Sequence, residues 1–354
     1  MNSKSEKPIR LAIVGSGSIA QVHAAAIARI PEAQLVAVCA RNRERAKELG
    51  APALAHVAHS MDELLAWGEF DGVLIATPSG AHAESALPAL RATKHVLCEK
   101  PLEIETARVN AMIEAANSSN VILAGFFPLR CGAGAKAIHQ ALTTGRFGRL
   151  TFLSARIKWW RDQSYYDGSN WRGTWELDGG GALMNQGIHA VDLMQWLGGP
   201  ISEVAAFSAT LAHQGLAVED SVTASMRFAN GALGTLEAAT SCYPGLALSL
   251  EISGDRGTAI LSDDRIESWN FADECAEDES IRSGRIGGEI GGGSSDPKAI
   301  SSEGHRQQIV AFCRAIRGES SEVIGGVEAG HAVAIVEAIY RSCRSKQSEP
   351  VKIL

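Results

Sequence analysis

A glycine-rich turn near the N-terminus, residues 15–20, most constrains what this chain can fold into. It reads Gly-Ser-Gly-Ser-Ile-Ala and joins a short apolar run, residues 9–14, to a helical pattern; a second apolar run follows at residues 35–40. In such a turn the first glycine allows the tight bend, the second lets a pyrophosphate approach the backbone, and the alanine lets helix and strand pack closely. The pattern predicts a dinucleotide-binding unit with the phosphates at the helix N-terminus, and the alternative is a plain strand–turn–helix.

The residues after the second strand bear on the choice of cofactor. An acidic residue there would bind the ribose 2′-hydroxyl of NAD, but this chain reads Ala40-Arg41-Asn42-Arg43. Two guanidinium groups without a carboxylate suit a 2′-phosphate, because arginine offers a planar charged fork to phosphate oxygens. The alternative is that both arginines are solvated residues at a helix start. We expect NADP(H) to be favoured over NAD(H).

Two later turns follow strand-like runs. Thr77-Pro78 ends residues 72–76, with His82 just beyond, and Glu99-Lys100-Pro101 ends residues 95–98. Loops at the carboxyl ends of parallel strands form the ligand crevice of a doubly wound sheet, so we expect both turns to face the cofactor; each could also be an ordinary surface turn. The predicted cofactor contacts are Gly15, Gly17, Ser18, Ile19, Ala40, Arg41, Arg43, Thr77, Pro78, His82, Glu99 and Lys100.

A second glycine-rich stretch, residues 179–192, carries the candidate catalytic residues. It reads Gly-Gly-Gly-Ala-Leu-Met-Asn-Gln-Gly-Ile-His-Ala-Val-Asp and runs into a predicted helix start at residues 193–197. If the stretch is helical, Asn185 and Asp192 lie one turn either side of His189, on one face. An imidazole held by a polar neighbour suits proton transfer near neutral pH. The equal alternative is a histidine that is only a satisfied core or surface residue.

An aromatic segment, residues 159–175, precedes this stretch. It holds four of the seven tryptophans together with Tyr165 and Tyr166, and it includes Arg161 and Arg172. Sugar ring faces pack on indole while hydroxyl and acid groups find polar partners, so this composition suits a saccharide; an aromatic core plug is an equal alternative. The predicted substrate contacts are Tyr165, Trp171, Arg172, Asn185 and His189.

The whole pattern predicts two domains, residues 1–126 and 127–354. Alternating strand patterns fill residues 201–261, with a hairpin signal at Asn230-Gly231. Such a sheet leaves a face that a second subunit can cover, so we expect a homodimer or homotetramer. Other expectations concern Arg130 (an anion contact or a solvated side chain), Glu219-Asp220 (a solvated turn), residues 273–298 (a mobile surface loop), and helices near residues 302–317 and 327–344.

Composition argues against several classes of function. The net charge of −7, from 33 basic and 40 acidic residues, and the lack of a basic stripe argue against a nucleic-acid partner. No apolar run is long enough to span a bilayer and residues 1–8 are polar, so no membrane partner is expected. Seven scattered cysteines without a Cys-x-x-Cys pair argue against a disulfide frame or a metal site and favour a reducing cytoplasm.

Together these motifs resemble the Gfo/Idh/MocA family (glucose–fructose oxidoreductase / inositol dehydrogenase) over nearly the whole chain. The carriers are residues 15–20, Ile75-Ala76-Thr77-Pro78 with His82, residues 95–101 and residues 179–192. The resemblance implies an α/β protein: a Rossmann domain with a doubly wound parallel sheet, then an α/β domain whose large open, mostly antiparallel sheet often forms an oligomer interface. It also implies hydride transfer between nicotinamide and a sugar or cyclitol carbon, with Lys100 and His189 at the positions of the family's lysine and histidine.

One position departs from the family pattern. Many members carry aspartate four residues before the histidine, where this chain has Asn185. An amide can orient an imidazole by a hydrogen bond but cannot stabilise the imidazolium by charge, so Asn185 either orients His189 or binds substrate. The variant Asn-Gln-Gly-Ile-His, preceded by Trp171-Arg172-Gly173-Thr174-Trp175, is similar to the branch that includes dehydrogenases of nucleotide-linked N-acetyl sugars and their acids.

The resemblance leaves three functions open. The first is a cytoplasmic NAD(P)-dependent dehydrogenase of a sugar, sugar derivative or cyclitol, in which His189 is the general base, Lys100 polarises the reacting oxygen and Asn185 assists. The second is a hydrolase that keeps its nicotinamide and cleaves a glycosidic bond by transient oxidation and elimination. The third is a non-catalytic ligand sensor on the same scaffold, against which the retained Lys100 and His189 argue.

Overall fold

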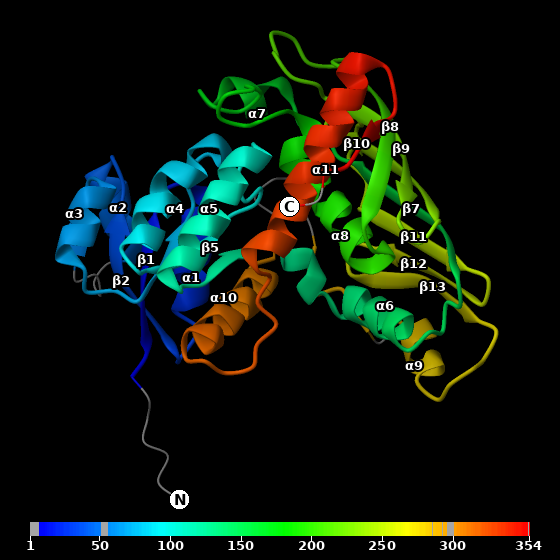
Figure 1. Ribbon diagram of the computed structural model, residues 1–354, viewed down its shortest axis with the longest axis horizontal. Coiled ribbons are helices and arrows are strands. Elements are labelled where there is room, and N and C mark those ends of the chain that lie inside the picture. Colours follow the sequence, from blue (N-terminus) through cyan, green and yellow to red (C-terminus); the bar gives the residue numbers. More distant parts are fainter. Residues whose placement is uncertain (1–6, 51–55, 285, 292, 296–300, 353) are drawn as a thin grey trace, which may run out of the picture. The chain divides into compact units, whose positions relative to one another are not determined.

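The chain folds into two compact units (Figure 1). The first comprises the residues up to Phe126 together with His305–Gly330, and the second comprises Phe127–Gly304 and His331–Leu354. The structure, a computed structural model, describes residues 7–50, 56–284, 286–291, 293–295, 301–352 and 354. Every helix in these described residues is too short or too polar to cross a membrane.

The first unit is built on a parallel sheet. Its described strands are β1 (Ile9–Val14), β2 (Ala33–Cys39), β3 (His56–Ala58), β4 (Gly72–Ile75), β5 (His95–Cys98) and β6 (Leu123–Gly125). They lie in the order β3-β2-β1-β4-β5-β6, and each neighbouring pair is parallel. The chain builds outward from β1 to β3 and then returns to the other side of β1 at β4, which confirms the predicted doubly wound Rossmann topology. The connecting helices are α1 (Ser18–Ile27), α2 (Arg43–Gly50), α3 (Met61–Trp67), η1 (Ser79–Ala81), α4 (His82–Arg91) and α5 (Thr106–Ser119).

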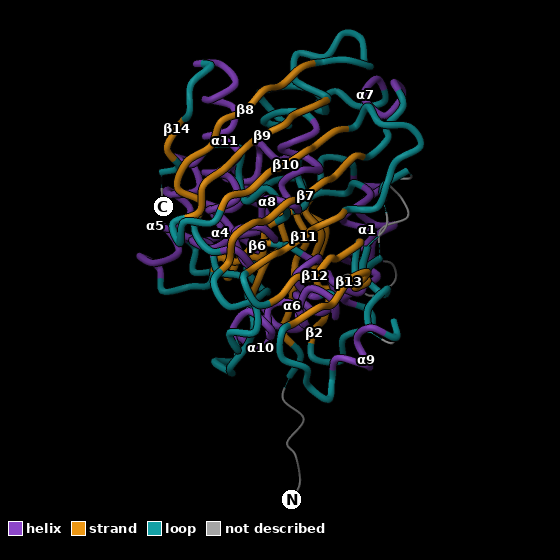
Figure 2. The backbone as a smooth tube through the Cα atoms, turned by 90° about the vertical axis from the view of Figure 1, so that its right-hand side faces the viewer, coloured by secondary structure: helices purple, strands orange, loops and turns teal. Residues whose placement is uncertain are grey.

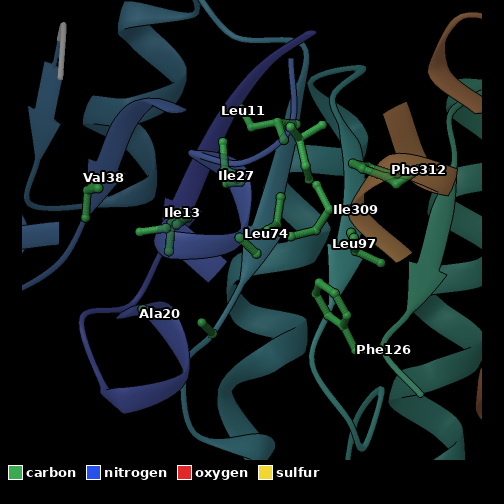
Figure 3. Packing of buried hydrophobic residues seen from close by; sticks show 14 of the residues in the cluster. Leu11, Ile13, Ala20, Ile27, Val38, Leu74, Leu97, Phe126, Ile309 and Phe312 are labelled. Carbon is green, nitrogen blue, oxygen red and sulfur yellow. The ribbon is translucent and has the colours of Figure 1, made fainter. Parts of the chain in front are cut away.

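Helix α10 (Glu303–Ile316) contributes to the core of the first unit, although it follows the second sheet in the sequence. Ile309 and Phe312 are fully buried in one cluster with Leu74 of β4, Leu97 of β5 and Phe126 (Figure 3). The predicted second domain, residues 127–354, is therefore not continuous, because residues 305–330 belong to the first unit. The physical reason is that an amphipathic helix packs against whichever apolar surface fits it, and the helical pattern alone does not identify that surface.

The second unit is built on a larger sheet. Its described strands are β7 (Leu150–Lys158), β8 (Ile201–Ala209), β9 (Ser221–Phe228), β10 (Leu233–Ala239), β11 (Ser249–Gly254), β12 (Gly257–Ser262), β13 (Arg265–Phe271) and β14 (Glu349–Pro350). They lie in the order β13-β12-β11-β7-β10-β9-β8-β14. Only β7 and β10 pair in parallel among these described strands, so the predicted mostly antiparallel sheet is confirmed. Asn230-Gly231 forms the predicted hairpin turn between β9 and β10, with φ of +91° at the glycine.

The two faces of this sheet differ. Side chains alternate between buried and exposed along β9, as expected for a sheet packed on one side only. Figure 2 looks onto the open face, with helices behind the strands. That face exposes apolar side chains, among them Phe207 at 77% and Leu233 at 45%. The helical segments of the second unit include η2 (Pro128–Cys131), α6 (Ala133–Thr143), α7 (Gln163–Asp167), η3 (Leu183–Gly187), α8 (Ile188–Gly198), α9 (Asp278–Arg282) and most of α11 (Gly326–Ser345).

The segment predicted as a mobile loop, residues 273–298, contains helix α9. Its Asp278 is buried and accepts hydrogen bonds from the guanidinium of Arg146 and from Trp269 Nε1, each at 2.7 Å. Residues 285, 292 and 296–298 lie outside the described part. The expectation of a loop throughout is wrong for the described residues, because partners distant in the sequence hold the carboxylate of Asp278 in place.

Candidate functional site

The turn after β1 has the geometry that its glycines predict. Gly15 has φ of +115°, and a Cβ there would lie 2.4 Å from the carbonyl oxygen of Ala76, so only glycine fits. Gly17 is exposed, and apart from its own residue and its two chain neighbours no described atom lies within 4 Å of a Cβ built on it. A hollow of about 300 Å³ opens beside this turn, lined by Ser16, Gly17, Ser18, Gln21, Arg45 and Glu48. The bare backbone at the start of α1 fits a pyrophosphate.

Three predicted cofactor turns share one edge of the parallel sheet. Gly15, Thr77 and Lys100 follow β1, β4 and β5, which are adjacent strands. Thr77, Pro78 and Lys100 are half-buried, and so is Ile19 in the first turn of α1. The carboxyl ends of parallel strands therefore bring these residues to the edge where ligands of such sheets bind.

The end of β2 is only partly described. Ala40 is buried and donates its backbone N–H to Ala58, whereas Arg41 is exposed. Arg43 begins α2, and its side chain lies outside the described part. Arg45, which sequence reasoning missed, lines the hollow beside Gly17. Its position in the first turn of α2 gave no signal in the linear sequence.

His82, predicted as a cofactor contact, is instead part of the interior. It is buried, with Nδ1 2.8 Å from the carbonyl oxygen of Pro101 and Nε2 3.0 Å from that of Thr77. Burial lowers the pKa of His82, although hydrogen bonds to these carbonyls oppose the shift. The imidazole of His82 thus contacts the Thr77 turn and the Pro101 turn, and each of its ring nitrogens faces a backbone oxygen.

Glu99, also predicted as a cofactor contact, is buried. Its Oε1 lies 2.9 Å from His23 Nε2 and 3.6 Å from His305 Nε2, and its Oε2 accepts from the backbone N–H of Lys100. Burial favours a higher pKa for Glu99, but its interactions with the imidazoles of His23 and His305 outweigh burial and hold the pKa well below its usual value. Glu99 therefore touches the Lys100 turn from the protein interior.

The glycine-rich stretch of the second unit forms a π-helical turn, η3, followed directly by α8. The helix starts at Ile188, before the predicted start at residues 193–197. Glu219 holds the beginning of η3: its carboxylate accepts from the backbone N–H groups of Gly181 at 3.0 Å and Leu183 at 2.9 Å, and from the Tyr340 hydroxyl at 3.1 Å. His189 and Asn185 are half-buried on this held segment.

A chain of polar side chains surrounds Asn185. Its Nδ2 donates to Asp178 Oδ1 at 2.7 Å, and its Oδ1 accepts from Gln186 Nε2 at 3.3 Å. The same Gln186 nitrogen lies 3.2 Å from the Tyr165 hydroxyl oxygen, to which it donates. Sequence reasoning missed Asp178 and Gln186 as site residues: Gln186 lies within the quoted motif but was given no role, and Asp178 lies just before the glycine-rich stretch.

The aromatic segment, residues 159–175, has a buried part and a part that lies beside the polar side chains of Asn185 and Gln186. Trp159 and Tyr166 are buried, as in the core-plug interpretation. Tyr165, Trp171 and Arg172 are half-buried, and the Arg172 guanidinium carbon lies 4.2 Å from the centre of the Tyr165 ring and 5.4 Å from that of Trp171. The structure therefore brings the predicted substrate contacts Tyr165, Arg172 and Asn185 together, with Gln186 between them.

Arg130 and Asp192 form a buried ion pair. Arg130 Nε and Nη2 donate to the two carboxylate oxygens of Asp192 at 2.8 and 2.6 Å. Both interpretations of Arg130, an anion contact or a solvated side chain, are wrong, because a bidentate partner from α8 occupies the guanidinium. Asp192 is 2% exposed, and each of its carboxylate oxygens accepts a hydrogen bond from Arg130.

Glu219-Asp220 is not a solvated turn. The two residues are 5% and 0% exposed. While Glu219 holds η3, Asp220 accepts from the backbone N–H groups of Leu211, Ala212 and His213, at 2.9, 2.8 and 3.1 Å. The expectation failed because tertiary structure supplies the donors to Glu219, which lie 36 to 121 residues away, and because the loop seven to nine residues before Asp220 folds back onto it.

Replacing Glu219 with glutamine should change how stability depends on pH. Burial raises the pKa of Glu219 from 4.5 to about 7. A group whose pKa is higher in the folded than in the unfolded protein stabilises the fold most at pH values below its unfolded pKa. This stabilisation is lost as the pH rises to the folded pKa. The loss is about 3 kcal/mol, so the free energy of unfolding of the natural protein should fall by that amount relative to Glu219→Gln between about pH 4.5 and 7.

Urea denaturation across this range measures the difference. The exposed Glu251 offers a matched control, since Glu251→Gln removes a solvated carboxylate and should have nearly the stability of the natural protein. Parallel stability curves for Glu219→Gln and the natural protein would contradict the prediction.

Known proteins resemble this chain over its whole length. Residues 9–127 match the family model described as "Oxidoreductase family, NAD-binding Rossmann fold", and residues 135–260 match "GFO/IDH/MocA C-terminal domain". The structure of the WlbA dehydrogenase from Bordetella pertussis in complex with NADH and UDP-GlcNAcA is 32% identical, with a TM-score of 0.90 over 99% of this chain and 100% of that chain. The WlbA dehydrogenase from Chromobacterium violaceum, with the same ligands, is 31% identical, with a TM-score of 0.89 over 99% and 98%.

A curated relative of another specificity is more distant. The myo-inositol 2-dehydrogenase of Thermotoga maritima is 26% identical over 75% of this chain and 79% of the relative. The two family models together match more than half of the chain and divide it near the boundary between the parallel and the antiparallel sheet. This protein therefore belongs to the GFO/IDH/MocA family of oxidoreductases and carries that family's NAD-binding Rossmann fold.

Proposed function

We propose that this protein is an NAD(P)-dependent dehydrogenase that oxidises a hydroxyl-bearing carbon of a nucleotide-linked N-acetylamino sugar acid. The observation that carries the proposal is the cluster in the second unit that joins the Arg172 guanidinium, the Tyr165 ring and the amides of Asn185 and Gln186. A guanidinium beside neutral amides and aromatic faces suits an acidic sugar. The WlbA dehydrogenases, which were crystallised with UDP-GlcNAcA, support this substrate class.

The proposed roles follow from the chemistry of the side chains. His189 takes the proton of the reacting hydroxyl, as an imidazole suits near neutral pH. Lys100 donates to the reacting oxygen and so stabilises the negative charge that develops there. Asn185 orients the imidazole or holds the substrate. A bound nicotinamide cofactor supplies the hydride acceptor; Gly15, Gly17, Ser18 and Ile19 would hold its pyrophosphate, and Thr77 and Pro78 would line the same edge.

Activity with a panel of sugars tests the proposal. The protein is incubated with NAD or NADP and with UDP-GlcNAcA, neutral nucleotide sugars, free sugars and cyclitols, and cofactor reduction is followed by absorbance. We expect the highest kcat/KM for the nucleotide-linked sugar acid. Preference for a neutral cyclitol would contradict the substrate class, turnover without net cofactor reduction would indicate the hydrolase, and binding without turnover would indicate the sensor.

The cofactor preference is a separate prediction. Because Ala40 stands where an acid would bind the ribose, and because Arg41 and Arg43 follow, NADP(H) should bind more tightly than NAD(H) by about 1.5–3 kcal/mol, the contribution of one hydrogen bond to a charged group. Fluorescence titration of both reduced cofactors measures this difference. The NADH complexes of the relatives make NAD(H) the alternative, and equal or tighter binding of NAD(H) would refute the prediction.

The oligomeric state is also a prediction. The open sheet face exposes Phe152, Phe207 and Leu233, and apolar residues on a broad sheet face are stabilised when a second copy covers them. We expect a homodimer or homotetramer in the cytoplasm. Light scattering at micromolar concentration that returned the 37.4 kDa mass of one chain would refute it.

A further inference from the structure

Asp178 joins two segments of the second unit. It is 1% exposed, and its two carboxylate oxygens face different parts of the chain. Oδ1 accepts from the side-chain amide of Asn185 at 2.7 Å, and Oδ2 accepts from the backbone N–H of Gly173 at 2.9 Å. One buried carboxylate therefore connects the turn that carries Asn185 to the aromatic segment that carries Trp171 and Arg172.

The same carboxylate determines which way the Asn185 amide points. An ionised carboxylate only accepts hydrogen bonds, so the amide nitrogen of Asn185 must face Asp178 and its oxygen must face away. That oxygen accepts from Gln186 Nε2, and the same nitrogen of Gln186 donates to the Tyr165 hydroxyl oxygen. The orientation of these side chains thus follows, one after another, from Asp178.

We propose that Asp178 is a positioning residue for the dehydrogenase reaction proposed above, on which this inference rests. It keeps the Asn185 amide in one orientation and keeps the η3 turn in register with Gly173 of the aromatic segment. Because Asp178 is buried and bonded on both sides, the groups are ordered when the protein folds and lose little freedom when substrate binds. The reaction then begins from an arrangement that needs no side-chain adjustment.

Exchange of the two side chains tests this role. The variants are Asp178→Asn, Asn185→Asp and the double variant, in the full-length protein. Asp178→Asn replaces one of the two acceptor oxygens by an NH2 group, which then faces another donor, and Asn185→Asp places two carboxylates opposite one another. Each single variant should therefore lower the midpoint of urea denaturation. The double variant again pairs one amide with one carboxylate, so its midpoint should recover towards that of the natural protein.

Kinetics with the nucleotide-linked sugar acid then separate positioning from stability alone. Asp178→Asn should lower kcat/KM by about 10- to 100-fold, with kcat reduced and KM raised, because both connected segments lose their fixed place. The double variant should remain low in kcat despite its recovered midpoint, because position 185 now carries a carboxylate in place of the oriented amide. Asp255→Asn is the matched control: Asp255 is exposed and accepts one backbone N–H, from Arg149 at 2.8 Å, so kcat and KM should not change.

Two results would overturn the proposal. One is an Asp178→Asn protein with the kcat and KM of the natural protein, and the other is a double variant in which kcat recovers together with the midpoint. If Asn185→Asp does not fold, the kinetics of Asp178→Asn decide alone. If the natural protein oxidises no sugar, the proposed function fails. The midpoints of urea denaturation still show whether Asp178 and Asn185 are coupled. Calorimetric binding of UDP-GlcNAcA to Asp178→Asn then tests positioning.

Discussion

Replacing His189 with alanine is expected to lower kcat/KM for oxidation by about 10²- to 10⁴-fold, the range expected for loss of one general base. The imidazole lies half-buried near the start of α8, on a segment whose beginning is held by Glu219. Removal of the ring should leave that backbone unchanged, because Glu219 bonds to Gly181 and Leu183 and not to the histidine. Steady-state kinetics with the nucleotide-linked sugar acid and both cofactors give the measurement.

His139 offers a matched control for this variant. It is a half-buried histidine of α6 whose ring stacks on Trp196 at 4.4 Å, and the proposal gives it no part in the reaction. His139→Ala should keep kcat near that of the natural protein while losing some stability. If His189→Ala instead retained near-normal turnover, Lys100 or a group of the substrate would be the base, and the role proposed for His189 would be wrong.

Replacing Gly17 with alanine is expected to weaken dinucleotide binding by about 10- to 100-fold without unfolding the protein. Among the described atoms nothing lies within 4 Å of a Cβ at Gly17, so the fold can accept the methyl group, but the methyl would occupy the space that the pyrophosphate needs. Fluorescence titration with reduced cofactor and urea denaturation together separate binding from stability.

Two other glycines of the first unit make this test specific. A Cβ at Gly325 also meets nothing within 4 Å in the described part, so Gly325→Ala should leave binding and stability unchanged. Gly15→Ala should lower the free energy of unfolding by about 2–5 kcal/mol, because φ is +115° and the Cβ would approach the Ala76 oxygen to 2.4 Å. Unchanged cofactor affinity in Gly17→Ala would argue against a pyrophosphate at this turn.

Local backbone requirements were readable from the sequence. The tight bend at Gly15 and the apolar strands on either side of the turn depend on neighbouring residues, and they suffice to predict a Rossmann sheet. The hairpin at Asn230-Gly231 and the alternation along β9 are local in the same way, and they predict the second sheet. Both features appear in the structure as expected.

The fate of the ionisable side chains was not readable in this way. Glu99 and His82 follow or flank predicted crevice turns, yet they lie in the interior of the first unit, where His305 from α10 reaches Glu99. A turn predicts where the backbone goes, but not which way each side chain of the turn points. Likewise, the helical pattern of α10 does not show which apolar surface the helix packs against, so α10 was assigned to the second domain.

The sequence by itself determined the class of fold and the turn that suits a dinucleotide, and it supplied the proposal of Lys100 and His189 as reacting groups, because these depend on residue type and short-range spacing. Only the tertiary structure decided which carboxylates are solvated. Glu219 meets Gly181 across 38 residues of chain, and Asp192 meets Arg130 across 62. A buried carboxylate is stable only where several donors converge on it, and donors so distant in sequence converge only when the chain has folded.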